Sequence, residues 1–290
     1  MRFGVEMAAW GRFADPRELA AVAREVEAAG WDGLFLWDAM LHDPDDLPKA
    51  DPWIALAAVA MATERIRIGP MVTPLPRRRP WKLAREAVTL DHLSGGRLTL
   101  GVGLGDPTEE EFGWFGEAGL DHRTRAAMLD EGLAILDGLW SGEPFAFAGE
   151  HYALHEMTFL PRPVQTPRIP IWVAGSWPNK APMRRAARWD GVHPFRVGAW
   201  MTPEDVRGLV AYVGERREGD PSALLGAGSS PFDVVVQGST QEDEPARAAE
   251  RVRASAEAGA TWWLETCGLD GRLLPEEEIE RLIRRGPPGR

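Results

Sequence analysis

The chain contains a single cysteine, Cys267, which excludes an internal disulfide framework and any zinc or iron–sulfur site built from several cysteines. Lysine is almost absent, occurring only at Lys49, Lys82 and Lys180, so arginine supplies the remaining basic side chains. No apolar run reaches the roughly 18 residues that a membrane-spanning helix needs. The first residues, MRFGVEM, also lack the pattern of a signal peptide, so a cytoplasmic location away from membranes is expected.

Basic residues are outnumbered by acidic ones, 33 against 44, which gives a formal net charge of −11. Such a balance repels nucleic acid and anionic membranes, so no nucleic-acid partner is expected. Hydrophobic residues make up 44% of the chain and charged residues 27%, values typical of a globular protein. The length of 290 residues fits one large α/β domain.

Short apolar runs alternate with amphipathic stretches along the whole chain, which indicates strands that alternate with helices. The expected strands are 3–7, 33–37, 66–69, 97–103, 169–174, 191–195, 232–237 and 261–265. The expected helices are 15–30, 51–61, 80–93, 123–140, 181–189, 203–217, 244–258 and 276–285. Eight such units favour a closed (β/α)8 TIM barrel over a doubly wound sheet. We expect one domain over 1–290, with 141–169 as an insertion after the fourth helix because it matches neither period.

In a (β/α)8 barrel, the functional groups lie where the strands end and the following loops begin. The glycines of Gly101–Gly105 could let a ligand approach the backbone closely, although a packing bend at a barrel corner explains them equally well. The turn Ala174–Lys180 precedes a helix and resembles an anion cradle, with Ser176 as a donor and Lys180 as a charge. A plain helix cap is the alternative for Ser176.

Other polar groups fall at the same expected rim. Arg77–Arg79 form a positive loop that either holds an anion or is solvated. His42 and His193 follow strands and could act as acid–base groups. Asp38 and Asp106 end two different strands, where each could hydrogen-bond a ring nitrogen, supply a proton or cap a turn. No spacing of histidines and carboxylates predicts a metal site.

The stretch Leu83–Gly105, with the run DHLSGGRLTLGVGLG, resembles the signature of the bacterial luciferase-like superfamily. Members of this superfamily are flavin- or coenzyme F420-dependent oxidoreductases built on a TIM barrel. The resemblance extends to Ala23–Asp38, Pro70–Pro80, Pro170–Ser176 and Ala186–Gly191, which together cover most of the chain in order. It also implies that the insertion is the segment that covers the substrate in the family.

The resemblance implies a set of cofactor contacts at the rim of the barrel. These residues are Asp38, Pro70, Met71, Val72, Gly103, Leu104, Gly105, Ala174, Gly175, Ser176 and Trp177. Pro70-Met71 matches a bulge, often formed at a non-prolyl cis peptide, that backs the ring. By the same resemblance Gly103–Gly105 lie beside the ring, and Gly175–Trp177 meet the cofactor phosphate.

The resemblance also implies three catalytic residues. Asp106 aligns with an acid that donates a proton in some F420-dependent members, Asp38 positions the ring, and His193 contacts the ring or the substrate over the mouth of the site. Many relatives carry a catalytic histidine where this chain has Ala39, and His42 lies one turn away. Reduction of an unsaturated substrate, or oxygen activation by reduced flavin, needs no base at position 39.

The sequence therefore predicts an oxidoreductase that uses reduced FMN or coenzyme F420 for monooxygenation or hydride transfer to a small organic substrate. A separate flavin or F420 reductase is a potential partner, and the apolar helix face Ala55–Met61 could support a homodimer. Two alternatives remain open at this point. One is a cofactor-free barrel enzyme in which the aspartates and histidines above perform acid–base chemistry, and the other is a flavin-binding relative without catalysis.

Overall fold

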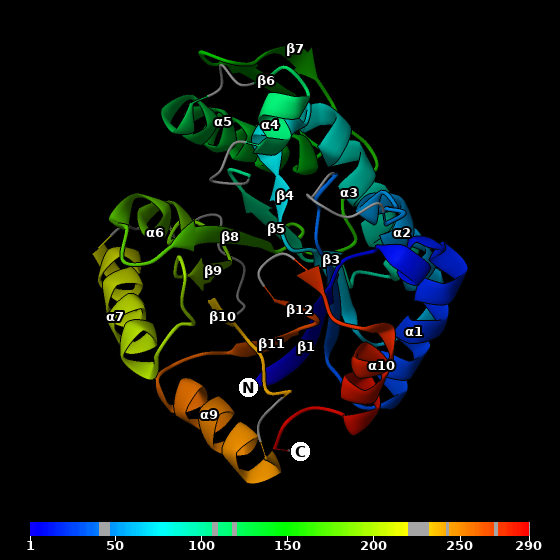
Figure 1. Cartoon of the computed structure of the whole chain (residues 1–290). Helices are drawn as coiled ribbons and strands as arrows, with labels where there is room; N and C mark the ends of the chain where they lie inside the picture. The colour runs from blue at the N-terminus through cyan, green and yellow to red at the C-terminus, as the bar shows by residue number, and fades with distance from the viewer. Residues whose placement is uncertain are drawn as a thin grey trace.

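Parallel strands, most of them buried, surround the centre of the molecule in the computed structural model (Figure 1). The structure describes residues 1–40, 47–105, 110–117, 121–219, 232–241, 244–269 and 272–289. The barrel strands are β1 (Arg2–Met7), β2 (Gly33–Leu36), β3 (Arg67–Pro70), β4 (Thr73–Pro74), β5 (Leu100–Gly103), β8 (Ile171–Ser176), β9 (Gly191–Phe195), β10 (Asp233–Gly238) and β11 (Trp262–Thr266). They pair in the order β3-β2-β1-β11-β10-β9-β8-β5-β4. A parallel bridge between Ile68 and Leu98 joins the two ends, so the expected TIM barrel is confirmed.

The third strand of the barrel is divided into two pieces. Its first piece, β3, pairs with β2, and its second piece, β4, pairs with β5. The non-prolyl cis peptide lies between them at Met71-Val72, one bond later than the Pro70-Met71 pair to which the resemblance pointed. Gly101 of β5 lies close to this break, because a Cβ at that position would overlap the carbonyl oxygen of Pro70.

Helices follow the strands and surround the barrel (Figure 1). They are α1 (Pro16–Ala28), α2 (Pro52–Ala62), α3 (Pro80–Ser94), α4 (Glu110–Trp114), α5 (His122–Trp140), α6 (Lys180–Ala186), α7 (Pro203–Gly219), α9 (Pro245–Glu257) and α10 (Glu276–Arg285). Asp15 and Asp51 cap α1 and α2 by accepting hydrogen bonds from backbone N–H groups of the first turn. Within the described ranges, no helix is both long and apolar enough to cross a membrane.

The insertion after α5 contains a hairpin that the sequence analysis did not predict. Its strands, β6 (Phe145–Ala148) and β7 (Ala153–Met157), pair antiparallel and lie outside the barrel beside α5 (Figure 1). The carboxylate of Glu131 on α5 accepts hydrogen bonds from the backbone N–H groups of 150–152. This carboxylate therefore fixes the hairpin turn to the helix. A second short hairpin, β12 (Gly268–Leu269) with β13 (Arg272–Leu273), follows β11 and was also not predicted.

Aromatic side chains fill the barrel interior near the N-terminal ends of the strands. The rings of Phe35, Trp172 and Trp262 pack with centroids 5.3 to 5.8 Å apart. Met71, Val235 and Leu264 are the other buried members of this cluster. This cluster fills the interior near the N-terminal ends of the strands. The opposite rim, at the C-terminal ends of the strands, is therefore left for a cavity.

Candidate active site

A cavity of about 760 Å³ lies at the C-terminal ends of the strands. This volume is in the range of sites that bind drug-sized ligands. Its walls come from β1, β2, the Met71-Val72 segment, β5, β8 and the first turns of α5 and α6. Among the expected cofactor contacts, the cavity is lined by Asp38, Met71, Val72, Gly103, Leu104, Gly105, Ala174, Gly175 and Ser176. The barrel therefore brings together residues from four separate parts of the sequence.

Pro70 and Trp177, the other two expected contacts, are not among the lining residues. The indole of Trp177 packs edge-on against Tyr212, with the ring centroids 6.4 Å apart. The ammonium of Lys180 lies over the same indole, 3.9 Å from its centroid. Lys180 also lies 4.3 Å from the ring of Tyr212. The charge that the sequence analysis assigned to an anion cradle is therefore held over two aromatic rings.

Asp38 lines the cavity, and its fully buried carboxylate accepts hydrogen bonds on both oxygens. Arg77 donates to Oδ1 at 2.6 Å, and Arg78 donates to Oδ2 at 2.9 Å. Thr73 Oγ1 and Trp53 Nε1 donate to Oδ2 at 2.7 and 3.2 Å. Two arginines of the predicted positive loop therefore turn inward, and Asp38 fixes that loop against the cavity wall.

Glu6 of β1 is a cavity residue that the sequence analysis missed. Its side chain is almost completely buried, Trp37 Nε1 donates to Oε1 at 2.8 Å, and Oε2 has no hydrogen-bond partner in the part of the chain that the structure describes. Burial raises the pKa of Glu6 to about 8, although the side chains of Trp37 and Gln237 oppose that rise. The carboxyl group is therefore mostly protonated at neutral pH. Strand alternation was the available signal, because it places Gly4 and Glu6 on one face and Val5 and Met7 on the other.

Polar groups also line the cavity on the side opposite Glu6. Counted in either direction around the barrel, β8 is four strands from β1, so Ser176 and Glu6 belong to opposite sides of the rim. Ser176 Oγ accepts a hydrogen bond from Asn179 Nδ2 at 2.8 Å. Arg123, exposed in the first turn of α5, adds a guanidinium to this side. One side thus offers a protonated acid and the other offers donors suited to an anion.

His193 lies inside the barrel on β9. Its Nδ1 is 3.2 Å from the carbonyl oxygen of Val235, and burial lowers the pKa of the imidazole to about 4. The ring is therefore neutral at neutral pH, and Nδ1 donates to the carbonyl. Phe195, two residues later on the same strand face, lines the cavity, whereas His193 is not among its lining residues. Its expected contact with substrate or cofactor stays a prediction.

Asp106, the expected proton donor, and His42, the candidate acid–base group one turn from Ala39, lie outside the described residues. Ala39 lines the cavity. In the part of the chain that the structure describes, no group of three or more His, Cys, Asp or Glu side chains is placed to hold a metal ion.

Comparisons with known proteins agree with this architecture. A family model described as luciferase-like monooxygenase matches residues 2–281. An F420-dependent glucose-6-phosphate dehydrogenase of Beutenbergia cavernae is 36% identical over 168 residues. That alignment covers 57% of this chain and 48% of the relative, so the chain matches about half the length of this curated relative.

Solved structures match over almost the whole chain. An F420-dependent secondary alcohol dehydrogenase in complex with an F420-acetone adduct superposes with a TM-score of 0.76 at 17% identity, covering 100% of this chain and 99% of that one. Monooxygenase RslO1 from Streptomyces bottropensis superposes with a TM-score of 0.73 at 22% identity, covering 98% and 97%. At these identities the likeness shows the fold.

Proposed function

The chain belongs to the luciferase-like monooxygenase family, and from that premise we propose that it reduces a small unsaturated organic substrate with reduced coenzyme F420 or reduced FMN. The observation that carries this proposal is the carboxyl group of Glu6, buried at a cavity wall with Oε2 unpartnered among the described residues. Relatives named as F420-dependent dehydrogenases and solved monooxygenases support redox chemistry at this rim.

The residues of the cavity fit a flat cofactor with an anionic tail. Met71 and Val72 offer an apolar wall, and Gly103 lies beside Val72 and presents backbone without a side chain. Ser176 and Arg123 are the donors available for the phosphate group. When bound, the reduced cofactor supplies the hydride equivalent.

Glu6 would supply the proton that completes reduction of the substrate. Its carboxyl group donates the proton to the substrate, and the carboxylate left behind keeps the hydrogen bond from Trp37. Solvent restores the proton after product leaves. Asp38 would hold the wall of the site, because its oxygens are already engaged by Arg77 and Arg78. Proton donation by Glu6 requires no base at Ala39.

The test is anaerobic turnover with each reduced cofactor separately, against a panel of α,β-unsaturated carbonyl compounds and followed by loss of the reduced cofactor. We expect substrate-dependent oxidation of one cofactor, with a kcat that falls as pH rises through about 8. Glu6→Gln should lower kcat by about 10²- to 10⁴-fold while leaving cofactor affinity nearly unchanged. Glu250→Gln, at an exposed position of α9, is the matched control.

Turnover of substrate without any redox cofactor would support the cofactor-free acid–base enzyme and refute the proposal. Cofactor binding without oxidation of either cofactor across the panel would support the non-catalytic relative. A Glu6→Gln variant with unchanged kcat would remove Glu6 as the proton donor.

A further inference from the structure

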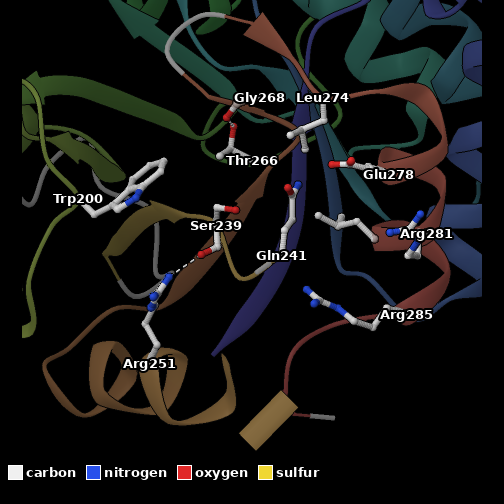
Figure 2. A pocket seen from close by; sticks show the side chains of 11 residues that line it. Trp200, Ser239, Gln241, Arg251, Thr266, Gly268, Leu274, Glu278, Arg281 and Arg285 are labelled. Carbon is white, nitrogen blue, oxygen red and sulfur yellow. Dashed lines mark hydrogen bonds between the residues drawn. The ribbon is translucent and has the colours of Figure 1, made fainter. Parts of the chain in front are cut away.

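A second pocket, of about 560 Å³, lies beside the cavity between the C-terminal ends of β10 and β11 and helix α10 (Figure 2). We refer to it as the α10 pocket. The two sites have no lining residue in common: in the segment after β9, Val197 lines the cavity and Trp200 lines the α10 pocket. The proposed redox function does not use this second site.

Arginines dominate the charged groups of the α10 pocket. Arg251 comes from α9, and Arg281 and Arg285 come from α10. Among the described lining residues, Glu278 is the acidic one. This local excess of positive charge stands in a chain whose net charge is −11, so it attracts an anion against the overall field.

The arginines of α10 differ in how far the protein already engages them. Arg285 donates to Thr240 Oγ1 at 2.7 Å and to its carbonyl oxygen at 3.1 Å, and lies 3.9 Å from buried Glu265. Arg281 makes no hydrogen bond or ion pair with any described residue. Its guanidinium is therefore the available cation of the pocket.

Gln241 provides an independent sign of a missing ligand group. Its amide nitrogen Nε2 is buried and has no hydrogen-bond partner among the described residues. In Figure 2 its side chain lies between Arg251 on the α9 side and the arginines of α10. A buried N–H group without an acceptor is unfavourable, and an oxygen of an anionic ligand would satisfy it.

Apolar side chains complete the wall. Trp200, Leu274 and Leu282 line the α10 pocket together with the polar groups. A ligand that fits both kinds of wall carries an oxyanion on an apolar body, because inorganic phosphate would leave the indole and the leucines without contacts.

We propose that the α10 pocket binds a small organic anion, a carboxylate or a phosphate ester attached to an apolar group. Arg281 and the Gln241 amide donate to the oxyanion, and the leucines of the pocket wall pack against the apolar part. Glu278 weakens the binding by its like charge. This site goes beyond the proposed redox function, and its test needs neither cofactor nor turnover.

The test is fluorine NMR titration of the purified chain with para-fluorobenzoate, para-fluorophenyl phosphate and the neutral para-fluorobenzamide. We expect at least one anion to bind and the amide to bind at least tenfold more weakly. Arg281→Gln should weaken anion binding about tenfold. Glu278→Gln should strengthen it about threefold, because a like charge is removed.

Arg284→Gln is the matched control, because Arg284 lies on the same helix and pairs with Glu280 instead. Equal anion affinity of the Arg281 and Arg284 variants, or equal affinity for anion and amide, overturns the proposal. Binding that disappears in Arg123→Gln and persists in Arg281→Gln assigns the anion to the cavity and also overturns it. Thermal unfolding of each variant confirms that the fold is intact.

Discussion

Replacing Glu6 by glutamine should remove a large pH dependence from the stability of the apo protein. Burial raises the pKa of Glu6 from its ordinary value of 4.5 to about 8 in the folded chain. Between these values the folded state holds a proton that the unfolded state has released, so the free energy of unfolding falls as pH rises. At about 1.4 kcal/mol for each pH unit, the whole window amounts to about 5 kcal/mol.

The assay is urea denaturation of wild type and Glu6→Gln from pH 5 to pH 9. Other titrating groups are common to both proteins, so the difference between their free energies of unfolding isolates Glu6. The free energy of unfolding of wild type should fall by several kcal/mol relative to that of Glu6→Gln as pH rises from about 5 to 8. The difference should level off above about 8. Parallel curves across the whole range would show that Glu6 ionises normally and would refute the reasoning.

Two further changes test the cavity wall and the packing behind it. Asp38→Asn should destabilise the chain by about 3 to 5 kcal/mol in urea denaturation, because it leaves the buried guanidinium of Arg77 without its carboxylate; a loss below about 1 kcal/mol would contradict the pairing. Gly101→Ala should destabilise by more than about 3 kcal/mol or prevent folding, because the new Cβ overlaps the Pro70 carbonyl oxygen. Gly214→Ala, on α7 with open space around it, should instead be neutral or stabilising by up to about 1 kcal/mol, and equal thermal shifts for the two glycine variants would contradict this packing.

The barrel could be predicted from the sequence because each unit carries local signals that agree with the global fold. Asp15-Pro16 and Asp51-Pro52 mark helix starts where the structure has α1 and α2, and the alternation fixes the number of units. The hairpin of β6 and β7 could not be predicted, because its short strands are at most half-buried and one carboxylate, Glu131, holds its turn.

The rim of the site was predictable because a barrel gathers the C-terminal ends of its strands at one face, as Gly103 and Ser176 illustrate. The hydrogen-bond partners of Asp38 were not predictable, because Arg77 and Arg78 lie about 40 residues later and only the folded loop turns them inward. Glu6 was missed for a related reason: its raised pKa comes from burial, which depends on strands far away in sequence.

The central claim is that the cavity at the rim binds a reduced or oxidised flat redox cofactor. Isothermal titration calorimetry of the apo protein with F420 and with FMN tests it most directly, using wild type and Ala126→Trp, which adds an indole at a residue of the cavity lining. The account predicts one cofactor bound per chain by wild type and at least tenfold weaker binding by the variant. Failure of folded wild type to bind either cofactor, or equal affinity of the two proteins, would contradict it.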